Sequence, residues 1–227
     1  MHAILYPILT VAYAALLGMG LAVLRRGASS GLAIMLLAVT AALLWDNLVL
    51  AAGAWAQASE GFERMHLSRF WLHALITPLL VPVSYELIRQ TGAEWARRPA
   101  ALLAVLLVTA GLIVLELATS VARLSLKPVF DHGILTYEPA VRPIAGGVMI
   151  AVVMAALLVA GWIVIRRGGP SALLAGTLAM LLGAAAALLT GIPSLHNLLE
   201  FVLAVSLWVT ADRLAARARR GLQKPGG

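Results

Sequence analysis

The sequence contains no cysteine, only two lysines and few charged residues of any kind. The absence of cysteine excludes disulfide bonds, thiolate nucleophiles, iron–sulfur clusters and thiolate zinc sites. Lys127 and Lys224 both lie outside the apolar stretches, so no lysine is placed to carry a retinal Schiff base of the opsin kind. Charged residues make up 12% and hydrophobic residues 62% of the chain. This composition, with a mean hydropathy of +0.95, excludes a soluble globular domain and a disordered chain.

Long apolar runs fill most of the 227 residues. Each run is close to the roughly 20 residues that a transmembrane helix needs, and the runs are continuously apolar rather than alternating, which favours helices over strands. The sequence therefore predicts an all-α polytopic membrane protein with seven transmembrane helices in a single domain, residues 1–227. We interpret the first run as a retained helix rather than a cleaved signal peptide. The seven predicted spans are 3–24, 31–55, 70–90, 100–122, 144–165, 171–191 and 197–215.

The distribution of arginine and lysine predicts the orientation. Twelve of the 17 basic residues follow the first, third, fifth and seventh runs, and the other five lie in the remaining connectors. Basic connectors stay in the cytoplasm, so we expect the N-terminus outside, the C-terminus inside and a basic cytoplasmic tail at about 213–227. This tail offers a contact to anionic lipid, whereas a nucleic-acid role is not expected because interleaved aromatics are missing. We expect an integral protein of a bacterial inner membrane.

Two connectors resemble each other, and two others are long. Residues 24–30 and 165–171 both contain an Arg-Arg-Gly turn between apolar runs, which suits two parallel three-helix repeats joined by the fourth run. The alternative is that short cytoplasmic turns converge on this composition. The longest connectors, 56–69 and 123–143, are both predicted to lie outside. Proline, glycine and aromatic residues in the second indicate an ordered cap.

Polar and ionisable residues enter the apolar runs mainly in the predicted outer half. Such residues are costly in hydrocarbon and usually mark a functional site. At 1.5 Å rise per residue, Asp46 and Glu116 lie roughly 10 Å below the outer boundary, and His73 and Glu200 about half as deep. Polar groups from four runs thus reach similar depth, which predicts an outward-facing polar pocket. Glu86 is the exception, near the cytoplasmic end of its run, where we expect it to pair with Arg89.

Three carboxyl groups are the candidate catalytic residues: Asp46, Glu116 and Glu200. A carboxyl group in apolar surroundings can stay protonated and act as a general acid, while a second carboxylate takes the proton back. The aromatic rings of Trp45, Trp71, Phe70 and Tyr137 are suited to stabilise a carbocation. The candidate substrate-binding residues are Trp45, Asn47, Arg69, Trp71, His73, Tyr137, His196 and Asn197. The substrate class expected is a lipophilic small molecule or lipid, with no cofactor and no metal.

Each of these residues also has a structural interpretation. Asp46 can belong to a buried ion pair, and Asn47 can bond between helices. Glu116 can pair with Arg123 one or two turns further on, and Glu200 can cap the start of the last run. Arg69 can extend to lipid headgroups. The joint occurrence of these groups on one side of the membrane favours a pocket over any one of these local roles.

The order of these residues resembles a known family. The chain is similar to the small integral membrane terpene cyclases of meroterpenoid and indole-diterpene pathways, which have a similar length and seven predicted helices. They carry a Trp-acid pair in the second helix, matched by Trp45-Asp46, and an essential acid near the last helix, matched loosely by Glu200. The family usually has Glu at the first position and Asp at the second, the reverse of this chain. The resemblance implies isoprenoid cyclisation, with Asp46 as proton donor and Glu200 as its partner.

Two other functions remain open. A metal-dependent lipid hydrolase of the seven-helix ceramidase and progestin-receptor-like kind would use carboxylate and imidazole ligands, but only His196 and Glu200 stand at a spacing that puts two ligands on one helical face. A transporter or small-ligand-binding protein would also use a polar outer pocket. Apart from Glu86, the inner half of the runs is nearly free of charge, which disfavours a path through the membrane.

Overall fold

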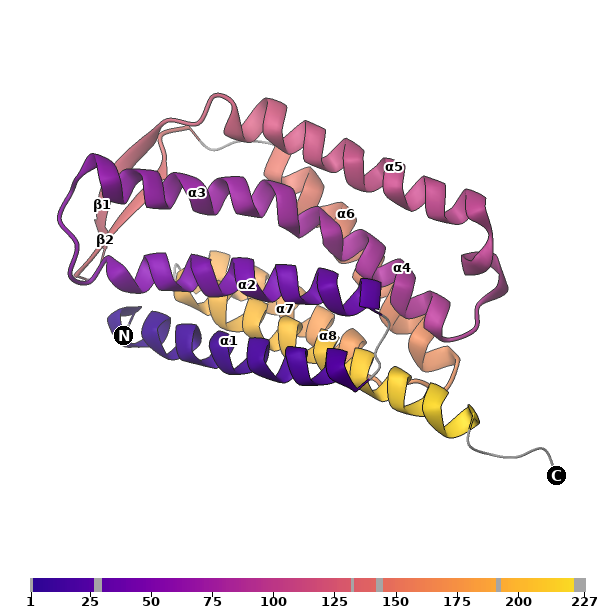
Figure 1. Cartoon of the computed structure of the whole chain (residues 1–227). Coiled ribbons are helices and arrows are strands. Elements are labelled where there is room, and N and C mark those ends of the chain that lie inside the picture. The colour runs from indigo at the N-terminus through magenta and orange to yellow at the C-terminus, as the bar shows by residue number, and fades with distance from the viewer. Residues whose placement is uncertain (1, 27–29, 132, 142–144, 191–192, 223–227) are drawn as a thin grey trace.

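The fold is known from a computed structural model that describes residues 2–26, 30–131, 133–141, 145–190 and 193–222. Nearly all of these residues are helical, and the long helices lie side by side (Figure 1). Five helices are long and apolar enough to cross a membrane: Ile4–Arg25, Gly31–Ala52, Glu60–Gln90, Pro99–Val121 and Gly146–Arg166. The predicted helical architecture is confirmed, and these five helices are consistent with a membrane protein.

The bundle is built from helix pairs that are neighbours in sequence. Helix α1 (His2–Arg25) packs along α2 (Ser30–Ala52), and α7 (Ala172–Thr190) packs along α8 (Pro193–Leu222). Helix α6 (Ala145–Arg166) lies against α7 and against α4 (Leu80–Gln90), while α5 (Pro99–Glu116) lies at the edge. Most side chains of α5 are exposed. Such an outward apolar surface is what a helix beside lipid presents.

The third span begins ten residues earlier than the sequence predicts. Helix α3 (Glu60–Ile76) includes most of the stretch that we assigned to a connector at 56–69. Ser59 caps this helix, since its side chain accepts a hydrogen bond from the backbone N–H of Phe62 at 3.3 Å, and Glu60 and Glu63 lie in the first turn. A capping serine followed by acidic residues stabilises a helix start, so this polar stretch is helical without being apolar.

Two prolines interrupt the same span. The 3₁₀ turn η1 (Thr77–Leu79) separates α3 from α4 and contains Pro78, and Pro82 follows in the first turn of α4. Proline removes a backbone donor and disfavours regular helix before it, so the residues themselves account for the break. Beyond the break α4 packs on α6, whereas α3 before the break lies beside α2. The break therefore spreads the two halves of the span toward different neighbours.

The long connector after α5 folds into a β-hairpin. A π-helical turn, η3 (Leu117–Val121), leads from α5 to strand β1 (Leu126–Asp131), which pairs antiparallel with β2 (Ile134–Pro139). The hairpin covers the end of the bundle at which the N-terminus lies (Figure 1). Leu135 and Tyr137 of β2 pack against Val49 and Phe62, and the N–H of Leu135 donates to the carbonyl of Gly53 at 3.0 Å. The predicted ordered cap is thus present.

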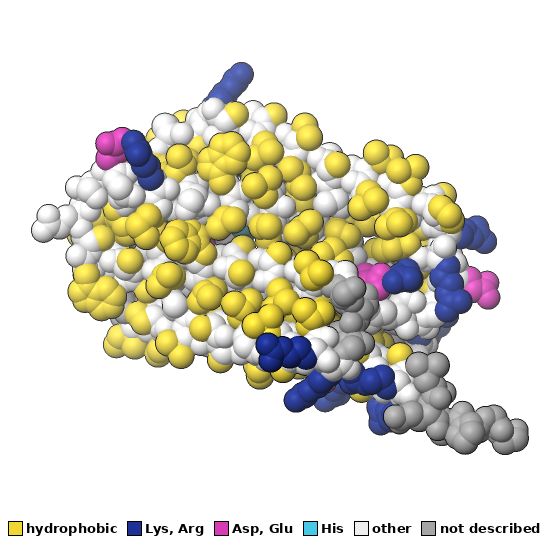
Figure 2. Space-filling view, in the orientation of Figure 1, with side chains coloured by type: hydrophobic (Ala, Val, Ile, Leu, Met, Phe, Trp, Pro, Cys, Tyr) yellow, Lys and Arg dark blue, Asp and Glu magenta, His cyan; other side chains and the backbone are white. Residues whose placement is uncertain are grey.

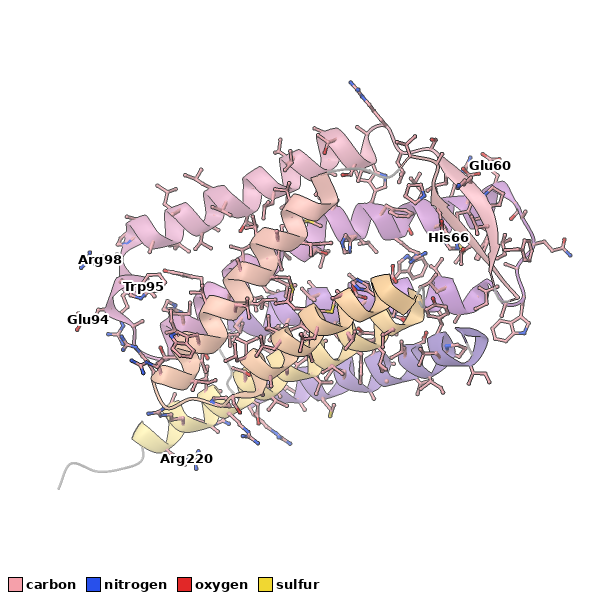
Figure 3. All side chains as sticks on the ribbon, turned by 180° about the vertical axis from the view of Figure 1, so that it is seen from behind. Glu60, His66, Glu94, Trp95, Arg98 and Arg220 are labelled. Atoms are coloured by element: carbon pink, nitrogen blue, oxygen red, sulfur yellow. The ribbon has the colours of Figure 1, made fainter. Side chains whose placement is uncertain are left out.

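Basic side chains gather at the opposite end. Figure 2 shows apolar side chains over most of one face, with a dense group of Lys and Arg beside the C-terminus. Arg98 and Arg220 are placed there with Glu94 and Trp95, whereas Glu60 and His66 lie near the hairpin (Figure 3). Arg217 Nη1 donates to the carbonyl of Arg167 at 2.9 Å. Arginine donors of this kind satisfy carbonyls that helix ends leave unpaired.

Candidate functional site

A cavity of about 300 Å³ lies inside the bundle between α2, α3, α6, α7 and α8. Its wall is mainly apolar, with Val153 and Met154 from α6, Met180 from α7 and Leu203 from α8 among the lining residues. Polar groups are contributed by three helices. They are Asp46 on α2, Arg69, His73 and the adjoining Thr77 at the end of α3, and His196, Asn197 and Glu200 on α8. The cavity therefore combines an apolar body with a polar part near the hairpin end.

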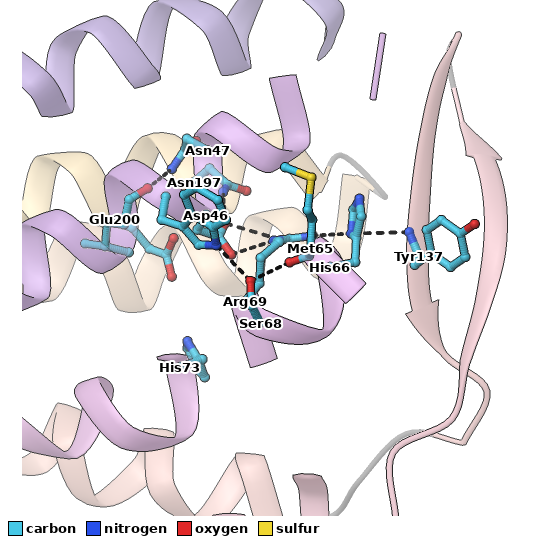
Figure 4. A network of polar contacts seen from close by, with 12 residues as sticks. Asp46, Asn47, Met65, His66, Ser68, Arg69, His73, Tyr137, Asn197 and Glu200 are labelled. Atoms are coloured by element: carbon cyan, nitrogen blue, oxygen red, sulfur yellow. Dashed lines mark hydrogen bonds and ion pairs between the residues drawn. The ribbon is translucent and has the colours of Figure 1, made fainter. Parts of the chain in front are cut away.

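Asp46 and Arg69 form a two-pronged ion pair. Arg69 Nε donates to Asp46 Oδ1 at 2.8 Å and Nη2 donates to Oδ2 at 3.3 Å. Asn197 Nδ2 also donates to Oδ2, at 3.4 Å, so α2, α3 and α8 meet at this carboxylate (Figure 4). The side chain of Asp46 is 24% exposed and that of Arg69 is 16% exposed. Three donors around one carboxylate fix its position.

His66 forms a further hydrogen bond with Arg69. Its Nδ1 lies 3.0 Å from Arg69 Nη1 and 3.4 Å from the backbone nitrogen of Tyr137 (Figure 4). Both neighbours are donors, so Nδ1 must be the acceptor and Nε2 carries the proton. His66 is fully buried beside Phe62, with ring centroids 4.7 Å apart. A continuous chain of bonds thus runs from the hairpin through His66 and Arg69 to Asp46.

Glu200 and His196 form a second polar pair on α8. Glu200 Oε1 lies 3.4 Å from His196 Nε2, and the side chain of Glu200 is 16% exposed against 41% for His196. Across the cavity, His73 Nδ1 lies 3.2 Å from the hydroxyl of Thr77. Unlike Asp46 and Arg69, these groups are not held by a bidentate ion pair. They are Glu200, His196, His73 and Thr77. They are the groups best placed to exchange protons or hydrogen bonds with an occupant.

The predicted pocket is present, but one predicted contributor does not line it. Glu116 is buried on α5, and its carboxylate faces α6 near Gly146 instead of the cavity. This follows from the edge position of α5, which contacts the outer side of α4 and α6. Glu116 Oε1 has no hydrogen-bond partner among the described residues, and none of their ion pairs joins Glu116 to Arg123. The suggested pairing of Glu86 with Arg89 is formed, at 2.6 and 2.8 Å.

Four predicted substrate-binding residues also lie outside the cavity lining. Trp45 donates from Nε1 to Ser68 Oγ at 2.9 Å. Neighbouring residues of a helix point in different directions, so Trp45 does not face the cavity with Asp46. Asn47 is fully buried and donates to the carbonyl of Leu43 at 2.9 Å. Trp71 is 44% exposed on the outer surface, and Tyr137 is buried beneath the hairpin. Arg69, His73, His196 and Asn197 do line the cavity, as does Phe70.

His66 was missed by sequence reasoning. It precedes Arg69 by one helical turn, but the stretch containing it was assigned to a connector because it is polar. The signal that could have found it is Ser59 followed by two acidic residues, which marks a helix start and places His66 and Arg69 on one face.

No group of three or more carboxylate or imidazole side chains in the described residues is arranged to hold a metal ion. The carboxylate and imidazole side chains that such a hydrolase would use, which are Asp46, His73, Glu116, His196 and Glu200, all belong to the described residues. Comparison with known proteins found no matching family model and no matching curated protein.

Proposed function

We propose that this chain is an integral membrane enzyme that binds a lipophilic substrate in the cavity and acts on it by carboxyl acid–base chemistry. The observation that carries the proposal is the meeting of Asp46, Arg69 and Glu200, from three separate helices, at one part of an otherwise apolar cavity. Ionisable groups are retained inside apolar bundles at a cost, and a concave apolar site with a few converging polar groups is the usual form of a ligand site.

The geometry favours different roles for the two carboxyl groups. Both oxygens of Asp46 already accept hydrogen bonds from Arg69 or Asn197, which suits Asp46 for positioning rather than for donating a proton to an occupant. Glu200 has only the weaker contact to His196, and both face the cavity. We therefore assign proton transfer to Glu200 with His196, in place of the proton donor Asp46 that the family resemblance implies.

Isoprenoid cyclisation is the narrowest form of this proposal. The apolar lining suits a hydrocarbon chain, and Phe70 offers one ring to a carbocation. The other aromatic side chains suggested for that role, Trp45, Trp71 and Tyr137, lie elsewhere. Acid–base chemistry on a lipophilic substrate, without commitment to cyclisation, is therefore the function that the cavity supports best.

The position of the cavity opening supports a substrate that enters from the bilayer. The lining residues with the largest exposure are His73 on α3, Ile150 on α6 and His196 at the start of α8. Helix α3 packs mainly on α2, whereas α6 packs on α4 and α7. The surrounding outer surface is apolar, so an opening between these helices faces lipid.

We further propose seven spans, with the N-terminus and hairpin outside and the basic end in the cytoplasm of a bacterial inner membrane. Support comes from the long apolar helices, from α3 and α4 acting as one broken span, and from the arginines gathered at one end. The described apolar part of α7 is shorter, Ala172–Ala185, and α8 carries basic residues in its last turn. The paired repeat of three helices remains a prediction.

The test is conversion of lipid by the purified, reconstituted protein. Total lipid and isoprenoid extracts should be incubated with wild type, Glu200→Gln and the matched variant Glu138→Gln, whose side chain is exposed on the hairpin. We expect a substrate to be consumed by wild type and Glu138→Gln but at least 100-fold more slowly by Glu200→Gln, since general acid–base groups contribute about 10² to 10⁴-fold. Stoichiometric binding without turnover would instead establish a non-enzymatic ligand-binding protein.

A further inference from the structure

The charge pattern of the cavity selects the head group of its occupant. Among the described residues that line the cavity, Arg69 is the only arginine or lysine. Its Nε and Nη2 donate to Asp46, and its Nη1 donates to His66 Nδ1. The positive charge is therefore balanced within the protein, and each guanidinium nitrogen already has a fixed partner. An anionic ligand entering this cavity would meet no uncompensated cation.

The carboxylate of Glu200 accepts hydrogen bonds and does not neutralise an anion. Glu200 has two carboxylate oxygens and only the 3.4 Å contact to His196 in the described structure. A carboxylate offers about four acceptor directions, so several stay free for a donor from the occupant. A second carboxylate or a phosphate beside Glu200 would bring like charges together in an apolar cavity, which is strongly unfavourable.

The size of the cavity limits the rest of the occupant. A volume of about 300 Å³ equals roughly ten water volumes of about 30 Å³ each, so about ten non-hydrogen atoms fit inside. Most of the wall is apolar, with Met154, Met180 and Leu207 among its members. A single alkyl or isoprenoid chain matches this wall, and any longer part extends through the opening toward lipid.

We propose that the cavity takes a single-chain lipid whose head group is a hydroxyl or an amine that donates a hydrogen bond to Glu200, and that it rejects lipids with a carboxylate or phosphate head. This inference rests on the proposed function only in taking the cavity as the substrate site. The proposal attributes the rejection of anionic lipids to the Asp46–Arg69 ion pair, because Asp46 neutralises the charge of Arg69. Asp46 is therefore a specificity-determining residue.

Four ten-carbon probes test this proposal: decanol, decylamine, decanoate and decyl phosphate. The protein is reconstituted in phosphatidylcholine nanodiscs and labelled with a decanol that carries a diazirine on its chain, and each probe is used as a competitor. We expect labelling of peptides from α6 and α8, and competition by decanol and decylamine at concentrations at least tenfold lower than by the two anions. Labelling outside the cavity, or equal competition by decanoate, would overturn the proposal.

Asp46→Asn provides the decisive variant, because it leaves the charge of Arg69 without a counter-charge while keeping an acceptor of similar shape. We expect decanoate to compete at least tenfold better with Asp46→Asn than with wild type, and Glu138→Gln to behave as wild type. An unchanged ranking in Asp46→Asn would contradict the role of the ion pair. Should Asp46→Asn not fold, Glu200→Gln serves instead, with an expected loss of at least tenfold in competition by decylamine.

These measurements involve no turnover. If lipid conversion is absent while the probe ranking holds, the proposed enzymatic function fails and the binding inference stands. If decanoate binds as well as decanol while Glu200-dependent conversion is observed, the inference fails and the enzymatic function stands.

Discussion

Arg69 Nη1 donates a hydrogen bond to Nδ1 of His66 at 3.0 Å, and this contact joins the hairpin to the cavity. The same ring nitrogen lies 3.4 Å from the backbone nitrogen of Tyr137 on β2. His66 is one helical turn before Arg69, so α3 places both side chains on one face. The hairpin thereby fixes the arginine that holds Asp46.

Substitution of His66 should distinguish its Nδ1 from its Nε2. Asparagine places a carbonyl oxygen where Nδ1 stood, whereas glutamine places its polar end one bond further out. We expect His66→Gln to lower the free energy of unfolding by about 1–3 kcal/mol, because the N–H groups of Arg69 and Tyr137 become buried and unpaired. His66→Asn should lose less than half of that. Denaturant unfolding of the purified protein measures both.

Ligand affinity provides a readout for His66 that general destabilisation would not move. Measured at a temperature at which each variant is fully folded, His66→Asn should rank decanol over decanoate as wild type does, and His66→Gln should narrow this difference, because Arg69 loses a fixed partner. An equal ranking in the two variants would show that His66 supports the fold without positioning Arg69.

The Asp46–Arg69 pair should show strong energetic coupling. Asp46→Ala leaves a largely buried guanidinium unpaired, and we expect it to cost about 3 kcal/mol in free energy of unfolding. The double variant with Arg69→Met should cost less than Asp46→Ala alone, since it removes the unpaired charge. A double-mutant cycle measures the coupling, and strictly additive effects would mean that the pair contributes nothing.

Close packing of α7 on α8 depends on Gly176. A Cβ placed there would meet Ser206, with its Oγ in hard contact and its Cβ 2.6 Å away. We expect Gly176→Ala to destabilise the protein by about 1–3 kcal/mol, the usual cost of overpacking. Gly18→Ala is the matched control, because no atom lies within 4 Å of its added Cβ and alanine favours helix. Thermal unfolding of both variants measures the difference, and similar unfolding temperatures would contradict the packing argument.

Cross-linking should test the opening toward the bilayer. The chain has no cysteine, so His73→Cys on α3 and Ile150→Cys on α6 would be the only thiols. Bridging them with bis-methanethiosulfonate reagents of graded length should slow entry of the photoreactive decanol at least tenfold, and reduction should restore it. Each single-cysteine variant treated with the same reagent is the control. Unchanged labelling of the bridged protein would place the entrance elsewhere.

Several features of this protein were predicted from sequence because they depend on local composition. Apolar runs of about 20 residues predict helices in a membrane wherever the neighbours lie, and Pro78 predicts a break because the missing backbone donor is a property of the residue itself. The ordered outer connector was also predicted, although its pairing as a hairpin was not. The start of α3 at Glu60 was not predicted, because residues 60–69 are mostly polar and their helix depends on the cap at Ser59.

The membership of the site depended on tertiary structure. Trp45 and Asp46 are adjacent in sequence, yet only Asp46 lines the cavity. The rotation of α2 about its own axis decides which of its side chains faces inward. Glu116 has the same predicted depth as Asp46 but lies on α5, at the edge of the bundle. Sequence by itself determined how deep each polar group lies along its helix. The packing of the helices decided which groups meet, because contact across a bundle depends on rotation and neighbourhood, which hydropathy does not encode.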